Sequence, residues 1–98
     1  MFLNIIKSYR DVVAICDKDI LGKKFVEGKF QLDIKENFYK GEEADEESVI
    51  KIIKKMTAED STFNIVGKKS VDAALKTGII AKEEIGEIQG VPFALVLF

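Results

Sequence analysis

The stretch of sequence that decides the fold runs from residue 45 to residue 78 and reads DEESVIKIIKKMTAEDSTFNIVGKKSVDAALKTG. Its first part has acidic residues early, lysines late and apolar residues at helical spacing, which predicts a helix over 45–56, or one turn longer. The apolar run Thr62–Val66 then predicts a strand, which Gly67 ends. Lys68–Thr77 is predicted to be a second helix. A helix–strand–helix unit therefore forms the centre of the fold.

Further strands are predicted on both sides of this unit. The chain of 98 residues has the length of one domain. The predicted order is β-β-β-α-β-α-β-β. Runs of strands with two helices between them indicate an α+β domain, with a mixed or mostly antiparallel sheet of about five to six strands packed by two main helices. The outer strands are expected at Phe2–Ile6, Val12–Cys16, Phe30–Ile34, Glu87–Gln89 and Phe93–Phe98.

The N-terminal third carries three more specific expectations. The strand Val12–Cys16 is apolar on both faces, so we expect it between other strands or under a helix, paired in a hairpin with the strand before it. Asp17 is expected to cap a short turn that follows. Phe30, Leu32 and Ile34 alternate with polar residues, which predicts a half-buried strand with these three side chains on its buried face.

The composition excludes several classes of catalytic site. The chain has no His, so it builds neither a Ser-His-Asp or Cys-His arrangement nor a His-ligated metal site. Its single cysteine, Cys16, lies in an apolar run and is expected in the core. No pair of carboxylates is spaced so that it must converge for acid–base chemistry. We therefore expect a non-enzymatic protein without catalytic residues, cofactor or metal.

The hydropathy pattern favours a soluble protein of the cytoplasm. No segment approaches the ~20 apolar residues of a membrane span. The apolar start of the chain reaches Lys7 too soon for a secretory signal. We expect no membrane partner.

The junction between the central strand and the second helix is a candidate ligand site. It contains Asn64, Gly67, Lys68, Lys69 and Ser70. Free backbone N–H groups at a helix N-terminus bind anions, and neighbouring lysines strengthen that attraction. Two interpretations remain open: a tight glycine turn with solvated lysines, or a loop that contacts a phosphate or another small anionic ligand.

Charge is distributed in blocks along the chain. The net charge is −2, which argues against coating of nucleic acid by bulk charge. Residues 61–82, however, hold four lysines against one aspartate, and Lys23 and Lys24 form a second basic pair. We hypothesise an RNA or ribonucleoprotein partner contacted by these lysines. Residues 42–47 carry five acids, so the RNA-binding face is expected elsewhere.

The C-terminal strand Phe93–Phe98 is apolar on both faces. One interpretation is an inner strand that is covered on both sides. The other is an edge strand that pairs with a second copy or another protein, which makes a homodimer or a protein-interaction module the alternative function.

Several short segments together resemble a known family. They are Cys16-Asp17 with Ile20-Leu21-Gly22, Phe38-Tyr39 with Gly41, Asn64-Ile65-Val66-Gly67, and Ile88-Gln89-Gly90-Val91-Pro92. In order and spacing they resemble the small archaeal proteins catalogued as domain of unknown function 424. The resemblance implies an archaeal, cytoplasmic, single α+β domain and supplies no activity. Members often carry His after Gly-Val-Pro, whereas this chain has Phe93, so an acid–base role does not transfer to that position.

Overall fold

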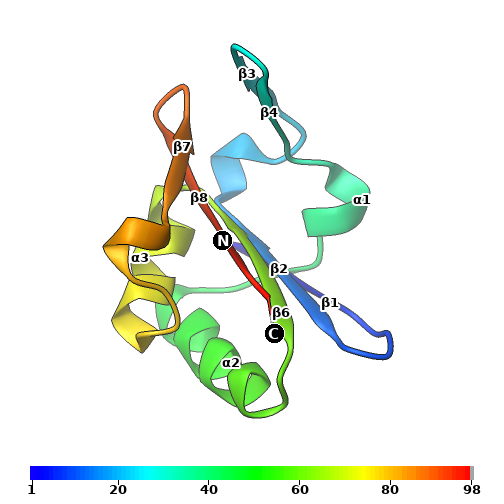
Figure 1. Cartoon of the computed structure of the whole chain (residues 1–98). Coiled ribbons are helices and arrows are strands. Elements are labelled where there is room, and N and C mark those ends of the chain that lie inside the picture. Colours follow the sequence, from blue (N-terminus) through cyan, green and yellow to red (C-terminus); the bar gives the residue numbers. More distant parts are fainter. Residues whose placement is uncertain (98) are drawn as a thin grey trace.

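A six-stranded mixed sheet organises the molecule (Figure 1). The computed structural model describes residues 1–97. The strand order is β5-β1-β2-β6-β8-β7, in which β2 and β6 are parallel and every other neighbouring pair is antiparallel. The predicted α+β class and a mixed sheet of six strands are confirmed, and a separate two-stranded sheet, β3-β4, accompanies it. The strands of this sheet are β1 (Phe2–Ile6), β2 (Val12–Cys16), β5 (Glu42–Glu43), β6 (Thr62–Val66), β7 (Gly86–Ile88) and β8 (Val91–Val96).

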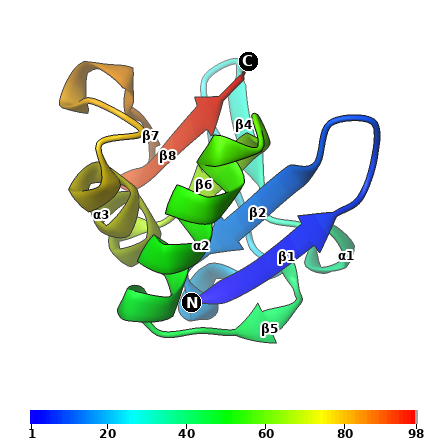
Figure 2. The same ribbon diagram turned by 90° about the horizontal axis from the view of Figure 1, so that it is seen from below.

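Two helices, α2 (Glu46–Ala58) and α3 (Lys68–Thr77), cover one face of the sheet (Figure 2). Asp45 caps the first of them: its side chain accepts a hydrogen bond of 2.8 Å from the backbone N–H of Ser48. Helix α2 ends at Ala58, two residues beyond Met56, which agrees with the prediction that the helix reaches up to one turn past Met56. The core under these helices includes Val49 and Ile53 of α2 and Phe63 of β6, all fully buried.

The opposite face is covered by shorter elements. They are a 3₁₀ turn η1 (Lys18–Ile20), the hairpin β3 (Lys24–Glu27) and β4 (Phe30–Asp33), and the single-turn helix α1 (Glu36–Tyr39). A second 3₁₀ turn, η2 (Lys82–Glu84), precedes β7. A smaller core joins Cys16 and Val66 of the sheet to Ile34 and Tyr39. Strand β2 is therefore covered on both faces and lies between β1 and β6, as its two-sided apolarity predicts.

The alternating segment that begins at Phe30 is only partly buried, which corrects one prediction. The side chain of Phe30 is 71% exposed, whereas Leu32 and Ile34 reach the smaller core. Strands β3 and β4 pair only with each other and project beyond the end of the main sheet (Figure 1). Alternation shows which side chains share a face, and at the tip of a projecting hairpin that face has nothing to pack against.

Strand β8 is paired with a neighbouring strand on both sides at Phe93 and has an open edge beyond that residue. It begins at Val91, two residues earlier than predicted; Val91–Phe93 pair with β7, and Phe93 also pairs with β6. Beyond Phe93 it pairs, within residues 1–97, with β6 alone, so Ala94–Val96 form an open edge. Ala94 is buried under the helices, whereas Leu95 and Leu97 are 57% and 73% exposed. Phe98 lies outside the described residues.

Candidate functional site

Parallel strands β2 and β6 end at the same edge of the sheet, and the segments that follow them meet there. Strand β2 leads directly into Asp17, and β6 leads into Gly67 and helix α3. The two oxygens of the Asp17 carboxylate accept hydrogen bonds from the backbone N–H of Lys69 (3.0 Å), the backbone N–H of Ser70 (2.8 Å) and the Ser70 hydroxyl (2.8 Å). Asp17 therefore caps α3, and its side chain makes no capping bond to the η1 turn for which the sequence predicts it.

Gly67 is required for this close approach. Its φ of +105° lies where only glycine is comfortable. A Cβ at this position would also lie 2.4 Å from Cγ of Asp17. Because Asp17 takes the N–H groups of Lys69 and Ser70, the protein's own carboxylate occupies the anion-binding end of α3. An external phosphate at this junction would be contacted by lysine side chains rather than by these amides.

An open cavity of about 880 Å³, which we name the lysine cavity, lies beside the Asp17 cap. Its positive groups are Lys18, Lys68, Lys69 and the N-terminus of Met1, and its carboxylates come from Asp17, Asp19 and Glu43. Glu43 pairs with Lys18 at 3.0 Å, and both side chains are exposed. Lys68 and Lys69 have no ion-pair partner among residues 1–97.

The acidic segment 42–47 does not lie as far from the lysines as expected. Strand β5 pairs with the start of β1, and this pairing places Glu43 in the lining of the lysine cavity. The sequence did not point to Lys18 either. Lys18 and Glu43 are both distant in sequence from Lys68, and they come together with it because β5, β1, β2 and β6 are neighbours in the sheet.

The second basic pair lies elsewhere. Lys24 opens strand β3 opposite Asp33, with Lys23 just before it, and neither lines the cavity. The structure therefore brings Lys68 and Lys69 together with Lys18, and it leaves Lys23 and Lys24 on the hairpin.

Asn64 also lies apart from these lysines. Its side chain points to the opposite face of β6 from Phe63 and Ile65 and lines a groove of about 230 Å³. The groove, which we name the Tyr39 groove, runs between the hairpin and the sheet. Its wall includes Gln31, Leu32, Tyr39, Asn64, Phe93 and Leu95. All of these side chains are uncharged at neutral pH. Nothing in the sequence signals that Tyr39 and Asn64 line the same groove.

Two groups beneath the groove are protonated at neutral pH. Burial raises the pKa of the Tyr39 hydroxyl to about 12 and that of the Cys16 thiol to about 11. Cys16 has no exposed surface, so the prediction of a core cysteine is confirmed. A buried, protonated thiol is a poor nucleophile.

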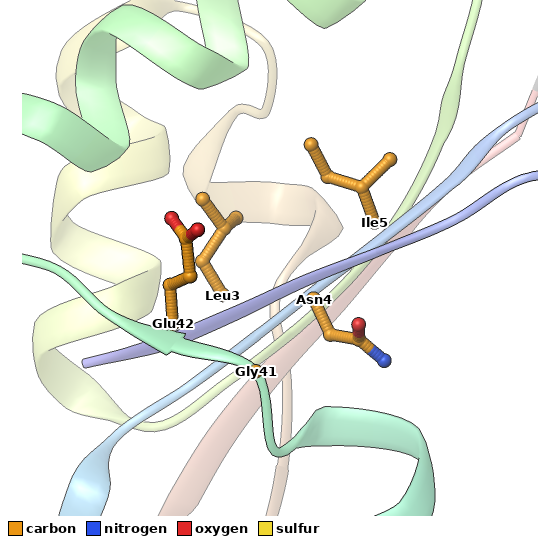
Figure 3. A pocket seen from close by; sticks show the side chains of 5 residues that line it. All are labelled: Leu3, Asn4, Ile5, Gly41 and Glu42. Atoms are coloured by element: carbon orange, nitrogen blue, oxygen red, sulfur yellow. The ribbon is translucent and has the colours of Figure 1, made fainter.

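A third hollow, of about 330 Å³, lies at the outer edge of β1 (Figure 3). Leu3 and Ile5 point to the same side as Glu42, whereas Asn4 points to the other (Figure 3). The Asn4 amide donates a 2.7 Å hydrogen bond to the carbonyl of Phe38. A Cβ on Gly41 would lie 2.2 Å from the carbonyl oxygen of Leu3, so the chain crosses β1 closely. These contacts give the residues of the hollow a structural role.

Comparison with known proteins identifies the family. The family model described as "Protein of unknown function (DUF424)" matches residues 6–97. The chain belongs to the DUF424 family. Its fold is also similar to the crystal structure of an uncharacterized conserved protein from Methanopyrus kandleri, with a TM-score of 0.86 and 29% identity. That match covers 97% of this DUF424 chain and 88% of the other. Among curated proteins, none matches.

The described part of this DUF424 protein contains neither a metal-binding cluster nor a membrane-spanning helix. Residues 1–97 contain no group of three or more His, Cys, Asp or Glu side chains placed to hold a metal ion. In the same residues, no helix has both the length and the apolar character to cross a membrane.

Proposed function

We propose that this DUF424 chain is a non-enzymatic cytoplasmic module that binds RNA or a ribonucleoprotein through Lys18, Lys68 and Lys69. The observation that supports the proposal is the pair Lys68 and Lys69, two exposed cations without an ion-pair partner in residues 1–97, at the rim of the lysine cavity. The Asp17 cap fixes the backbone from which both side chains extend.

The neighbouring charges set the strength of this interaction. The cavity mixes four positive groups with three carboxylates, so its field is weaker than that of a purely basic groove. Asp17 is already hydrogen-bonded, and Glu43 is paired with Lys18. We therefore expect about two to three phosphate contacts, a modest affinity, and a slope of log K against log salt of roughly −1.4 to −2 for single strands.

The test is RNA binding measured against salt concentration by fluorescence anisotropy, with single-stranded homopolymers as probes. The double variant Lys68→Gln/Lys69→Gln is expected to weaken binding and to reduce the magnitude of the slope by about 1.4. The matched control is Lys54→Gln/Lys55→Gln, which removes the same charge from exposed positions on α2. Absence of binding at low salt, or equal effects of the two double variants, refutes the proposal.

A second function, self-association, is favoured by the open edge of β8. The segment from Ala94 to Leu97 carries no charge, and it exposes Leu95 and Leu97. Proteins normally protect such an edge with charged residues or proline. We propose that a second copy pairs with it antiparallel. A two-fold axis then places each apolar side chain against its counterpart, without like-charge repulsion.

Sedimentation equilibrium tests this second proposal. We expect a dimer that Leu95→Lys converts into a monomer, because the new charge lies on the paired edge. Val26→Lys is the matched control, since Val26 is 48% exposed and lies on strand β3 of the hairpin, which is not part of the open edge of β8. A monomeric wild-type chain at high concentration contradicts the proposal.

A further inference from the structure

The Tyr39 groove holds two polar side chains that the protein leaves unsatisfied. The Tyr39 residue is 7% exposed, and its hydroxyl, which is not among the fully enclosed atoms, has no hydrogen-bond partner among residues 1–97. The amide of Asn64, half-buried in the middle of β6, likewise has none in the described chain. A hydroxyl and an amide are thus available to a ligand in one groove.

The groove excludes charge. None of the side chains in its wall is ionised at neutral pH. Placing a charged group there would cost free energy, because no opposite charge compensates its loss of water. The occupant is therefore neutral, which separates this site from the lysine cavity.

The size and walls of the groove restrict the occupant further. Its volume of about 230 Å³ is below the roughly 300–1,000 Å³ of typical small-molecule sites, so it suits one ring system. Phe93, Leu32 and Leu95 give it apolar walls. The ring of Phe93 is held in place by Gly86 of the paired strand: an added Cβ there would lie 2.5 Å from its Cζ. A flat ring with hydrogen-bonding edges fits these walls.

We propose that the Tyr39 groove binds one unstacked adenine base of a single-stranded RNA. An Asn amide pairs with adenine through two hydrogen bonds, one donated and one accepted. Unpaired RNA bases are generally held by such edge contacts together with stacking on aromatic rings. The Tyr39 hydroxyl supplies the third polar contact. This inference rests on the proposed RNA binding: the adenine in the groove belongs to the same RNA strand whose phosphates contact the lysines.

The two sites are close enough for one strand of RNA. Asn64 and Lys68 are four residues apart, which limits their separation along the chain to about 14 Å. The lysine cavity then attracts the backbone of any sequence, whereas the groove selects the base.

The experiment separates base from phosphate by using nucleosides. Adenosine and uridine carry no phosphate, so their titration into the ¹⁵N-labelled protein, followed by NMR, reports on the groove alone. We expect adenosine to shift the side-chain amide signals of Asn64 and Gln31 and to bind about tenfold more tightly than uridine. Asn64→Asp and Tyr39→Phe should each weaken adenosine binding, by about tenfold for the former. Asn37→Asp, the same change at an exposed position on α1, should leave binding unchanged.

Each result decides between the proposals. If adenosine and uridine cause no shifts while the lysine variants still alter the salt dependence of RNA binding, the groove proposal fails and RNA binding stands. If adenosine binds and RNA does not, the lysine site is refuted and so is the assignment of the base to RNA. If N-acetyltyrosinamide binds in the groove and adenosine does not, the occupant is a protein side chain and the base is excluded. Should Tyr39→Phe fail to fold, Asn64→Asp alone carries the test.

Discussion

Replacing Asp17 by alanine tests how the two parallel strands are tied to helix α3. The Asp17 side chain is 7% exposed and accepts three hydrogen bonds from the first turn of α3. The substitution leaves the N–H groups of Lys69 and Ser70 without their acceptor. It also leaves the Ser70 hydroxyl, which is fully buried, without a partner.

The expected cost follows from these contacts. Loss of a helix N-cap costs about 0.5–2 kcal/mol. A buried hydroxyl left unsatisfied costs about 1–3 kcal/mol more. We therefore expect Asp17→Ala to lower the free energy of unfolding by about 3 kcal/mol, a large part of the stability of a domain of this size. The melting temperature should fall by roughly 12–24 °C.

Urea denaturation followed by circular dichroism measures this loss, and a double-mutant cycle locates it. On a Ser70→Ala background no hydroxyl is orphaned, so Asp17→Ala should cost about 1–2 kcal/mol less than it does in the wild type. Asp19→Ala is the control: this exposed carboxylate two residues away should change stability by no more than about 0.5 kcal/mol. A cost below about 1 kcal/mol for Asp17→Ala, or strict additivity with Ser70→Ala, refutes the reasoning.

Three further predictions are tested by the same denaturation measurements. Ser61→Ala should stabilise the protein by about 1 kcal/mol, because the Ser61 hydroxyl is buried without a partner in residues 1–97; an unchanged or lower stability contradicts this. Gly67→Ala should cost about 3 kcal/mol or more through strain and contact with Asp17, whereas Gly90→Ala, with positive φ but open space around it, should cost about 1 kcal/mol. Burial raises the pKa of the Cys16 thiol from 9.0 to about 11, so as the pH rises this thiol ionises in the unfolded chain before it does in the folded one. The contribution of Cys16 to the free energy of unfolding should therefore be constant below pH 9 and fall by up to about 1.4 kcal/mol per pH unit as the pH rises toward 11. Cys16→Ala should remove the fall between pH 9 and pH 10, whereas above pH 10 Tyr39, whose pKa burial raises from 10.0 to about 12, should still lower stability in the variant. An identical pH profile for the variant and the wild type between pH 9 and pH 10 would refute the cause.

The elements of the fold were predictable because their patterns are local. Helix α2 combines a capping aspartate, early acids, late lysines and an apolar face, and all four are visible in the sequence around residues 45–58. The apolar character of β2 on both faces is equally local, and it correctly indicates a strand between two others. Phe30 shows the limit of such patterns. Alternation specifies a face, but only tertiary structure decides whether anything covers it.

The arrangement of the candidate sites was not predictable, because it depends on strand pairing. Asp17 meets Ser70 across 53 residues only because β2 and β6 are parallel neighbours. For the same reason Lys18 joins Lys68, and Glu43 joins both, although the sequence separates the acidic and basic segments into blocks. Asn64 and Lys68 were grouped because they are close in sequence, whereas strand geometry turns Asn64 toward the groove.

The Asp17 cap also determines what kind of recognition this end of the sheet can perform. A helix N-terminus with free N–H groups binds phosphate directly and with defined geometry. Here Asp17 takes the N–H groups of Lys69 and Ser70, so a phosphate would be contacted mainly by flexible lysine side chains, which carry no sequence information. Any selectivity must then come from a site that distinguishes uncharged groups. The Tyr39 groove has that property, since it is neutral and is lined by Tyr39 and Asn64, whose polar groups make no hydrogen bond within residues 1–97. Raising the salt concentration should therefore weaken RNA binding while leaving the preference for adenine unchanged.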